Sequence, residues 1–224
     1  WNLTLRELRS KYRRSFLGWA WSLLNPLSNM LIYTFVFGVV FGATAPIGEP
    51  SGLNVYALYL LCGILPWGFF SQVTNLGMNA LLSNASLVRK VAFARETLVI
   101  SQVIFCFVQW SIEMTLLAVA LIIAGSPIIP WLPVTILLMV CLAVYAAGFA
   151  LALSAAAVFF RDLRYLWSIL VQVMFFATPI IYTPDRLEGK LPAAIDFILT
   201  WNPMAVFILT FRHMLYGGAA PNWG

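Results

Sequence analysis

Four long stretches of this chain carry no charged side chain, and they limit its fold more than any other feature. They are residues 15–48, 50–88, 114–160 and 165–184. Each stretch can supply the ~20 apolar residues with which an α-helix crosses a bilayer. Their apolar residues are continuous, whereas the strands of a membrane barrel alternate apolar and polar side chains. The sequence therefore predicts an all-α membrane protein with a single transmembrane domain, residues 1–224.

The composition supports the same class. Hydrophobic residues make up 62% of the chain and charged residues 9%, whereas soluble domains have ~25% charged residues. A soluble two-layer fold would leave much of this apolar surface in water. The net charge of +5 indicates attraction to membrane lipids or phosphates rather than a nucleic-acid surface.

The apolar pattern predicts five spans, which are residues 23–42, 55–76, 97–124, 133–160 and 166–182. Before them, residues 1–22 predict an amphipathic helix lying on the membrane, with aromatic and leucine side chains in one arc and basic side chains outside it. The outer gate segment, 183–216, holds two apolar pieces, 191–200 and 203–216. Both are too short to cross, so we expect short re-entrant helices there. We also expect a sixth span after residue 224.

The basic residues predict the orientation. Ten of the thirteen Lys and Arg residues lie before the first span, in the gap 83–96 or in the gap 161–164. The gaps 43–54 and 125–132 hold none. Loops rich in Lys and Arg stay in the cytoplasm, so the N-terminus is expected there.

Motifs for catalysis are absent from the sequence. There is no G-x-x-x-x-G-K-[ST] loop for nucleotide phosphates, no G-x-S-x-G elbow and only one histidine. We therefore expect a chain that is not an enzyme and holds no cofactor or metal. Its three cysteines fall in apolar runs and predict buried structural thiols; they are Cys62, Cys106 and Cys141.

Three sets of residues have both a functional and a structural interpretation. The gap 83–96 is either a connecting loop or a short helix on which a soluble partner docks. Glu113 lies near the middle of a span, one turn after Gln109, and is either a functional site or a hydrogen-bonded structural group. Aromatic residues either pack and anchor the spans or form a channel wall on which sugar rings stack; the candidates are Trp67, Phe69, Phe70, Phe175, Phe176 and Tyr182.

Several motifs together resemble those of a known family. The first is RELRSKYRRSFLGWAWSLLNP at residues 6–26. The others are LVRKVAFARE at 87–96, FRDLR at 160–164, TPIIY at 178–182 and WNP at 201–203. They resemble the permease subunits of ABC exporters for polysaccharides and polyol phosphates, which export O-antigen, capsule, teichoic acid and galactan. The chain departs from that pattern at Ala94, where a proline often stands, and in its missing sixth span.

The resemblance implies a homodimer in the bacterial plasma membrane, with two copies of a separate ATPase subunit that binds ATP and Mg. It implies a channel near spans one and five that a lipid-linked glycan enters sideways. The outer gate would include Trp201, Asn202 and Pro203. The residues that it implies for coupling to the ATPase are Leu87, Val88, Arg89, Lys90, Phe93, Arg95 and Glu96.

Four arginines are candidates for contact with the lipid phosphate of that glycan, because a guanidinium binds phosphate in a bidentate manner. They are Arg13, Arg14, Arg161 and Arg164. Ordinary anchoring to anionic lipids is the alternative for each.

The sequence thus favours the channel-forming subunit of an ATP-driven exporter of lipid-linked polysaccharide. One alternative is an efflux permease for drugs or small lipids. A second is a membrane-embedded glycosyl- or acyltransferase, for which Glu96 and Asp162 are the acidic groups at hand.

Overall fold

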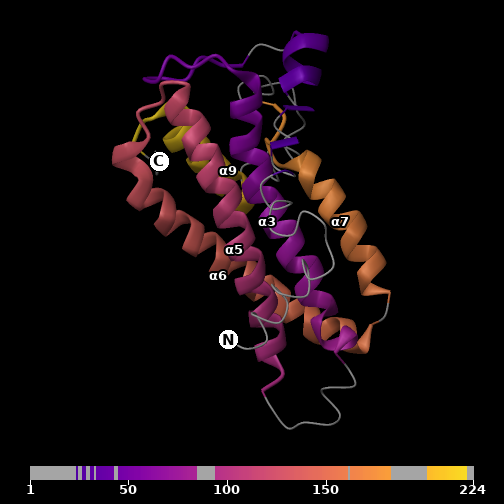
Figure 1. Ribbon diagram of the computed structural model, residues 1–224. Coiled ribbons are helices and arrows are strands. Elements are labelled where there is room, and N and C mark those ends of the chain that lie inside the picture. The colour runs from indigo at the N-terminus through magenta and orange to yellow at the C-terminus, as the bar shows by residue number, and fades with distance from the viewer. Residues whose placement is uncertain are drawn as a thin grey trace.

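The computed structural model describes residues 24, 27–28, 31–32, 34–42, 45–84, 94–160, 162–182 and 201–220. Every regular element in these ranges is helical (Figure 1). The predicted interfacial helix at 1–22, loop residues 85–93 and the first gate piece at 191–200 lie outside the described residues. The elements are η2 (Thr34–Val40), α3 (Tyr56–Ser83), α5 (Glu96–Ile123), η3 (Ile129–Trp131), α6 (Leu132–Phe159), α7 (Leu163–Ala177), α9 (Pro203–Arg212) and η5 (His213–Gly217).

The helix α3 forms the centre of the molecule. It contacts α5, α6, α7 and α9, and Figure 1 shows it between α5 and α6 on one side and α7 on the other. Protein neighbours bury 78% of an 18-residue apolar stretch of α3. The corresponding share is 28% for α5 and for the helix that ends at Phe159. The helix α3 is therefore packed against protein on nearly all sides, while α5 and α6 each keep an exposed apolar face.

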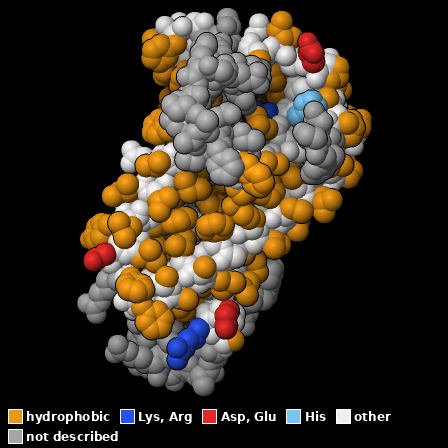
Figure 2. Space-filling model, turned by 180° about the vertical axis from the view of Figure 1, so that it is seen from behind, with side chains coloured by type: hydrophobic (Ala, Val, Ile, Leu, Met, Phe, Trp, Pro, Cys, Tyr) orange, Lys and Arg blue, Asp and Glu red, His pale blue; other side chains and the backbone are white. Residues whose placement is uncertain are grey.

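The outward faces of α5, α6 and α7 are apolar. Exposed side chains include Ile104 on α5, Val144 on α6 and Ile169 on α7. Figure 2 shows hydrophobic side chains over the middle of one face, with few charged side chains, which lie near its margins. A continuous exposed apolar surface of this kind suits lipid or another protein rather than water.

A close approach holds α3 against α6. A Cβ built on Gly77 would lie 2.6 Å from Cβ of Ala150, so the two helices approach to a distance that a side chain at residue 77 would prevent. Small residues allow this kind of packing between membrane helices.

Among the described residues, three helices are long and apolar enough to cross a membrane: α3, α5 and α6 with its leading turn η3. They match the second, third and fourth predicted spans, and α3 extends further, to Ser83. At 28 residues, α3 and α5 are each about 42 Å long. The predicted first span is described only in part, with a π-helical segment at Thr34–Val40.

The prediction for span five, residues 166–182, was wrong at its C-terminal end. The helix α7 is 15 residues long and ends at Ala177, where Thr178 has the extended backbone φ −101°, ψ 136°. Pro179 explains the end, because a proline disfavours the α conformation in the residue before it. At about 22 Å, α7 does not match the thickness of the bilayer core on its own.

Two of the three cysteines are buried as predicted, and one is not. Cys62 on α3 and Cys106 on α5 are buried, whereas Cys141 is exposed. The apolar run around residue 141 did not show which face of α6 is turned outward.

Candidate functional site

The helix α9 starts at the motif Trp201-Asn202-Pro203. Asn202 is its N-cap, and Oδ1 of its side chain accepts a hydrogen bond from the backbone N–H of Met204 at 3.0 Å. Pro203 occupies the first helical position, where the missing N–H costs nothing. The motif therefore has a local physical role, because asparagine is among the best N-caps and proline is preorganised for the first turn.

The same asparagine joins α9 to the corner that follows α7. Nδ2 of Asn202 donates a hydrogen bond to Oγ1 of Thr178 at 2.8 Å, in a buried environment. The structure thus brings together two motifs, 178–182 and 201–203, that are separated in sequence and that both belong to the family resemblance.

The corner itself, Thr178 to Tyr182, is not helical. Each of its last four carbonyl oxygens nevertheless accepts a hydrogen bond from a side chain. Tyr56 Oη donates to the carbonyl of Ile181 at 2.8 Å, and Tyr59 Oη donates to that of Tyr182 at 3.4 Å. The carbonyls of residues 179 and 180 bind Arg212. Backbone outside a helix is tolerated at membrane depth only when protein satisfies it in this way.

Arg212, the last residue of α9, is buried at 5% exposure. Its Nη1 donates to the carbonyl oxygen of Pro179 and its Nη2 to that of Ile180. On α3 it donates from Nε to the carbonyl of Tyr59 at 3.3 Å and from Nη1 to the hydroxyl of Tyr59 at 3.0 Å. Cζ also lies 3.9 Å from the centre of the Tyr59 ring, a cation–π distance. One guanidinium therefore joins α9, α3 and the corner.

Gly63 provides the space for that guanidinium. A Cβ built on this residue of α3 would lie 2.8 Å from Nη2 of Arg212 and 3.3 Å from Cγ2 of Ile208. Any larger residue at position 63 would have to displace the arginine or α9.

The turn η5, His213–Gly217, connects α9 to the two loops at this end of the molecule. Oη of Tyr216 donates to the carbonyl of Leu53 at 2.8 Å and accepts from the backbone N–H of Val55 at 3.2 Å. Ser126 Oγ donates to the carbonyl of Leu215 at 2.8 Å. We name the corner 178–182, α9 and η5 together the outer cap, after the side of the membrane on which the sequence predicts them. Hydrogen bonds link this cap to the loops at 45–55 and 124–131.

Sequence reasoning missed the central member of the outer cap. Arg212 is one of the three basic residues outside the predicted cytoplasmic groups, and the sequence pattern assigned it no role. A signal was available: an arginine at the end of an apolar segment, ten residues after Asn202, is costly to bury unless it is satisfied. The sequence did not show which groups satisfy it.

The aromatic candidates for a channel wall fall into two groups. Phe69 and Phe70 are buried in the core, where Phe69 stacks on Trp110 with ring centres 4.3 Å apart and Phe70 stacks on Tyr145 at 5.8 Å. Trp67 is buried beside Phe175.

The second group is more accessible. Phe176 on α7 is 63% exposed, and Phe175 is half-buried. Tyr182 is also half-buried, and its hydroxyl donates to the carbonyl of Phe176 at 3.0 Å. This group lies at the C-terminal end of α7 and in the corner after it.

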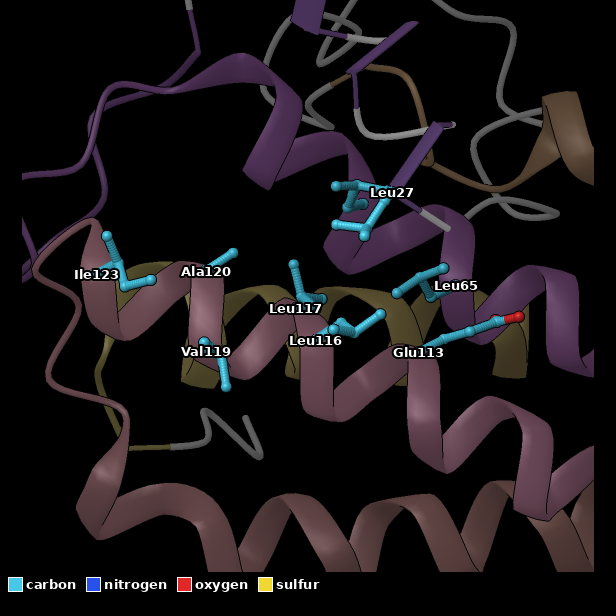
Figure 3. Close-up of a pocket in the computed structure, with 9 residues that line it drawn as sticks. Leu27, Leu65, Glu113, Leu116, Leu117, Val119, Ala120 and Ile123 are labelled. Carbon is cyan, nitrogen blue, oxygen red and sulfur yellow. The ribbon is translucent and has the colours of Figure 1, made fainter. Parts of the chain in front are cut away.

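Glu113 lies on a cavity of about 220 Å³ between α3, α5 and Leu27. Oε1 of Glu113 accepts a hydrogen bond from Nε2 of Gln109 at 3.4 Å. Figure 3 shows Leu27, Leu65 and Leu117 pointing toward one another at this cavity. The remaining lining is apolar: Leu61, Leu116, Val119, Ala120 and Ile123.

At the end of the molecule away from the outer cap, the charged residues that the structure describes are exposed. Arg95 and Glu96 start α5, and Asp162 and Arg164 start α7. The start of α5 and the end of α6 lie toward the lower end in Figure 1. The remaining candidates for coupling and lipid phosphate lie outside the described residues; they are Leu87, Val88, Arg89, Lys90, Phe93, Arg13, Arg14 and Arg161.

Long apolar helices packed around the central helix α3, with a hydrogen-bonded cap at one end, are the features of a multi-span membrane domain. The sequence matches the model of the ABC-2 type transporter family over residues 1–216. This chain therefore belongs to the ABC-2 type transporter family.

Similar proteins include the O-antigen export system permease protein RfbA of Klebsiella pneumoniae, 28% identical over 96% of this chain and 79% of that protein. RfbA of Myxococcus xanthus is 29% identical over 99% of this chain and 81% of its own length. The polysialic acid transport protein KpsM of Escherichia coli is 23% identical over 96% of this chain and 80% of its length.

Proposed function

We propose that this chain forms the membrane path of an exporter that moves a lipid-linked polysaccharide from the cytoplasm across the bacterial plasma membrane. The observation that carries the proposal is the match to polysaccharide export permeases over 96–99% of the chain. The motifs at 178–182 and 201–203 meet in the outer cap, which supports a role for that cap as the outer gate.

The energy source is an ATPase on a separate chain. Two copies of this ATPase would bind ATP and Mg and dock on the cytoplasmic loop 87–96. Arg95 and Glu96, the charged residues of this loop that the structure describes, are exposed, as docking requires. A second copy of the present chain would complete the channel, with the exposed apolar face of α7 turned toward it.

The glycan would pass the accessible aromatics at the outer end of α7. Phe176 and Phe175 offer ring faces there, and Tyr182 adds a hydroxyl. Phe69 and Phe70 would instead stabilise the fold, since their rings stack on other aromatic side chains of the protein. Arg13, Arg14, Arg161 and Arg164 would meet the lipid phosphate at headgroup depth on the cytoplasmic side.

A gene deletion tests this function in cells. We expect deletion of the gene to remove polysaccharide from the cell surface and leave lipid-linked polysaccharide inside. A plasmid copy should restore export only when the ATPase partner is intact; a partner with its nucleotide-binding lysine replaced is the control.

Two other results would each contradict the proposal. Loss of drug resistance with a normal surface polysaccharide would indicate an efflux permease. Glycosyl- or acyltransfer by the purified chain without any ATPase would indicate a membrane-embedded enzyme.

A further inference from the structure

We propose that Arg212 is a positioning residue that makes the outer end of α7 and the gate helix α9 move as one unit. This inference rests on the proposed export function and adds a residue that determines how the outer gate is held. It begins from an arginine that is 5% exposed at the end of a ten-residue helix.

The guanidinium has no spare nitrogen for a ligand. It carries five N–H donors, and its four hydrogen bonds use Nε, Nη1 and Nη2 together. All the acceptors are neutral: three backbone carbonyls and the Tyr59 hydroxyl. The arginine therefore links elements of the protein and is not placed to bind the phosphate of a cargo.

The acceptors lie on two elements, the corner that follows α7 and the central helix α3. Pro179 and Ile180 continue directly from α7, and Tyr59 belongs to the central helix α3. A buried cation that lost these acceptors would be strongly destabilised. For this reason α9 cannot leave the corner unless all these bonds break together, and a displacement of α7 is transmitted to α9.

The fork shape of arginine is needed here. Nη1 and Nη2 reach the carbonyls of two successive residues while Nε reaches α3. A lysine ammonium is a point charge and does not span such a set of acceptors. The variant Arg212→Lys thus keeps the charge and removes the link.

Gly63 offers a second, independent way to disturb the link. An alanine there would place Cβ 2.8 Å from Nη2 of Arg212 without changing the arginine. Gly68, on the same helix, has nothing within 4 Å of a built Cβ, so Gly68→Ala is a matched control. Both substitutions favour the helix to a similar degree.

The experiment uses the complex of this chain with its ATPase in lipid vesicles, with export and ATP hydrolysis measured on the same preparation. We expect Arg212→Lys and Gly63→Ala to lower export about tenfold while ATP hydrolysis changes by less than about twofold. Gly68→Ala should match the wild type. In an Arg212→Met background, Gly63→Ala should cause a smaller loss than in the wild type, because Nη2 of Arg212, the atom nearest to the new Cβ, is then absent.

A second measurement does not depend on the cargo. Ile180 is fully buried and Cys141 is exposed, so Ile180→Cys is placed in a Cys141→Ser background and treated with a membrane-impermeant thiol reagent. We expect slow labelling with Arg212 and Gly63 intact, and labelling about tenfold faster with either variant, since the corner opens more often.

Several results would overturn the inference. In the vesicle experiment, these are a wild-type rate of export in Arg212→Lys and Gly63→Ala, a loss of export matched by an equal loss of ATP hydrolysis, or additive losses of export in the double variant. In the labelling experiment, the contrary result is an unchanged labelling rate at position 180. If the wild-type complex exports no polysaccharide but the labelling difference is present, the proposed function fails and the positioning role stands.

Discussion

Nδ2 of Asn202 lies 2.8 Å from Oγ1 of Thr178, and this buried hydrogen bond joins the start of α9 to the corner that ends α7. Both residues sit beside a proline that sets the local backbone, Pro203 after Asn202 and Pro179 after Thr178. The two prolines end one helix and begin the other, and the bond between their neighbours closes the outer cap.

Replacing Thr178 by valine should destabilise the outer cap. Valine keeps the shape and removes the acceptor of Asn202, so a buried donor loses its partner at a cost of about 1–3 kcal/mol. We expect a lower thermal unfolding midpoint for the purified chain in detergent. The control is Thr115→Val on α5, where the threonine is exposed and bonds only to the carbonyl of Ser111; an equal loss in both variants would contradict the role of the bond.

Replacing Gly77 by valine should separate α3 from α6. A Cβ at this position would already lie 2.6 Å from that of Ala150, and overpacking costs about 1–3 kcal/mol or more. Detergent-solubilised protein should aggregate or unfold at lower temperature. Gly148→Val is the control, because nothing lies within 4 Å of a built Cβ there; tolerance of both changes would refute the close approach.

Reversing the charge of Arg89 and Lys90 should uncouple the ATPase. An acidic docking surface on the ATPase that attracts the basic loop would repel a loop with glutamate at both positions. We therefore expect the ATPase rate to lose its response to lipid-linked glycan. The rate is measured in vesicles with and without the glycan. In the control, the charges of Arg186 and Lys190, the basic residues that follow span five, are reversed. Its ATPase rate should respond normally to the glycan. A normal response in the first variant would remove the docking role.

Glu113 is expected to be structural rather than part of the transport path. Its carboxyl accepts a bond from Gln109, and a glutamine at 113 keeps an acceptor oxygen of the same shape. We expect Glu113→Gln to export within about twofold of the wild type. Glu113→Leu should instead lower the unfolding midpoint, because Gln109 loses this acceptor. A large loss of export in the glutamine variant, with normal stability, would make Glu113 functional.

The long apolar runs were sufficient to predict the three long helices, although α5 also carries Glu96 and Glu113, because burial of apolar side chains in lipid dominates their energetics. They were insufficient at the end of α7. There Thr178-Pro179 interrupts the helix for a backbone reason, while the side chains continue to be apolar through Tyr182.

Hydropathy also did not separate inward from outward faces. Phe70 is fully buried and Phe176 is 63% exposed, although both lie in similar apolar runs, since exposure depends on which helices are neighbours. Arg212 lies in the apolar segment 203–216, where a short helix is expected, but its partners on α3 and in the corner are far from it in the sequence. Only the fold brings Gly63, Tyr59 and Arg212 together.

ATP-driven transport in vesicles tests the central claim most directly. The permease and its ATPase are reconstituted with lipid-linked polysaccharide, and the amount of glycan that reaches the opposite side of the membrane is measured with and without ATP. The account predicts glycan transfer that requires ATP, an active ATPase and this chain. Transfer at the same rate without ATP, or none in a complex that hydrolyses ATP normally in response to the glycan, would contradict it.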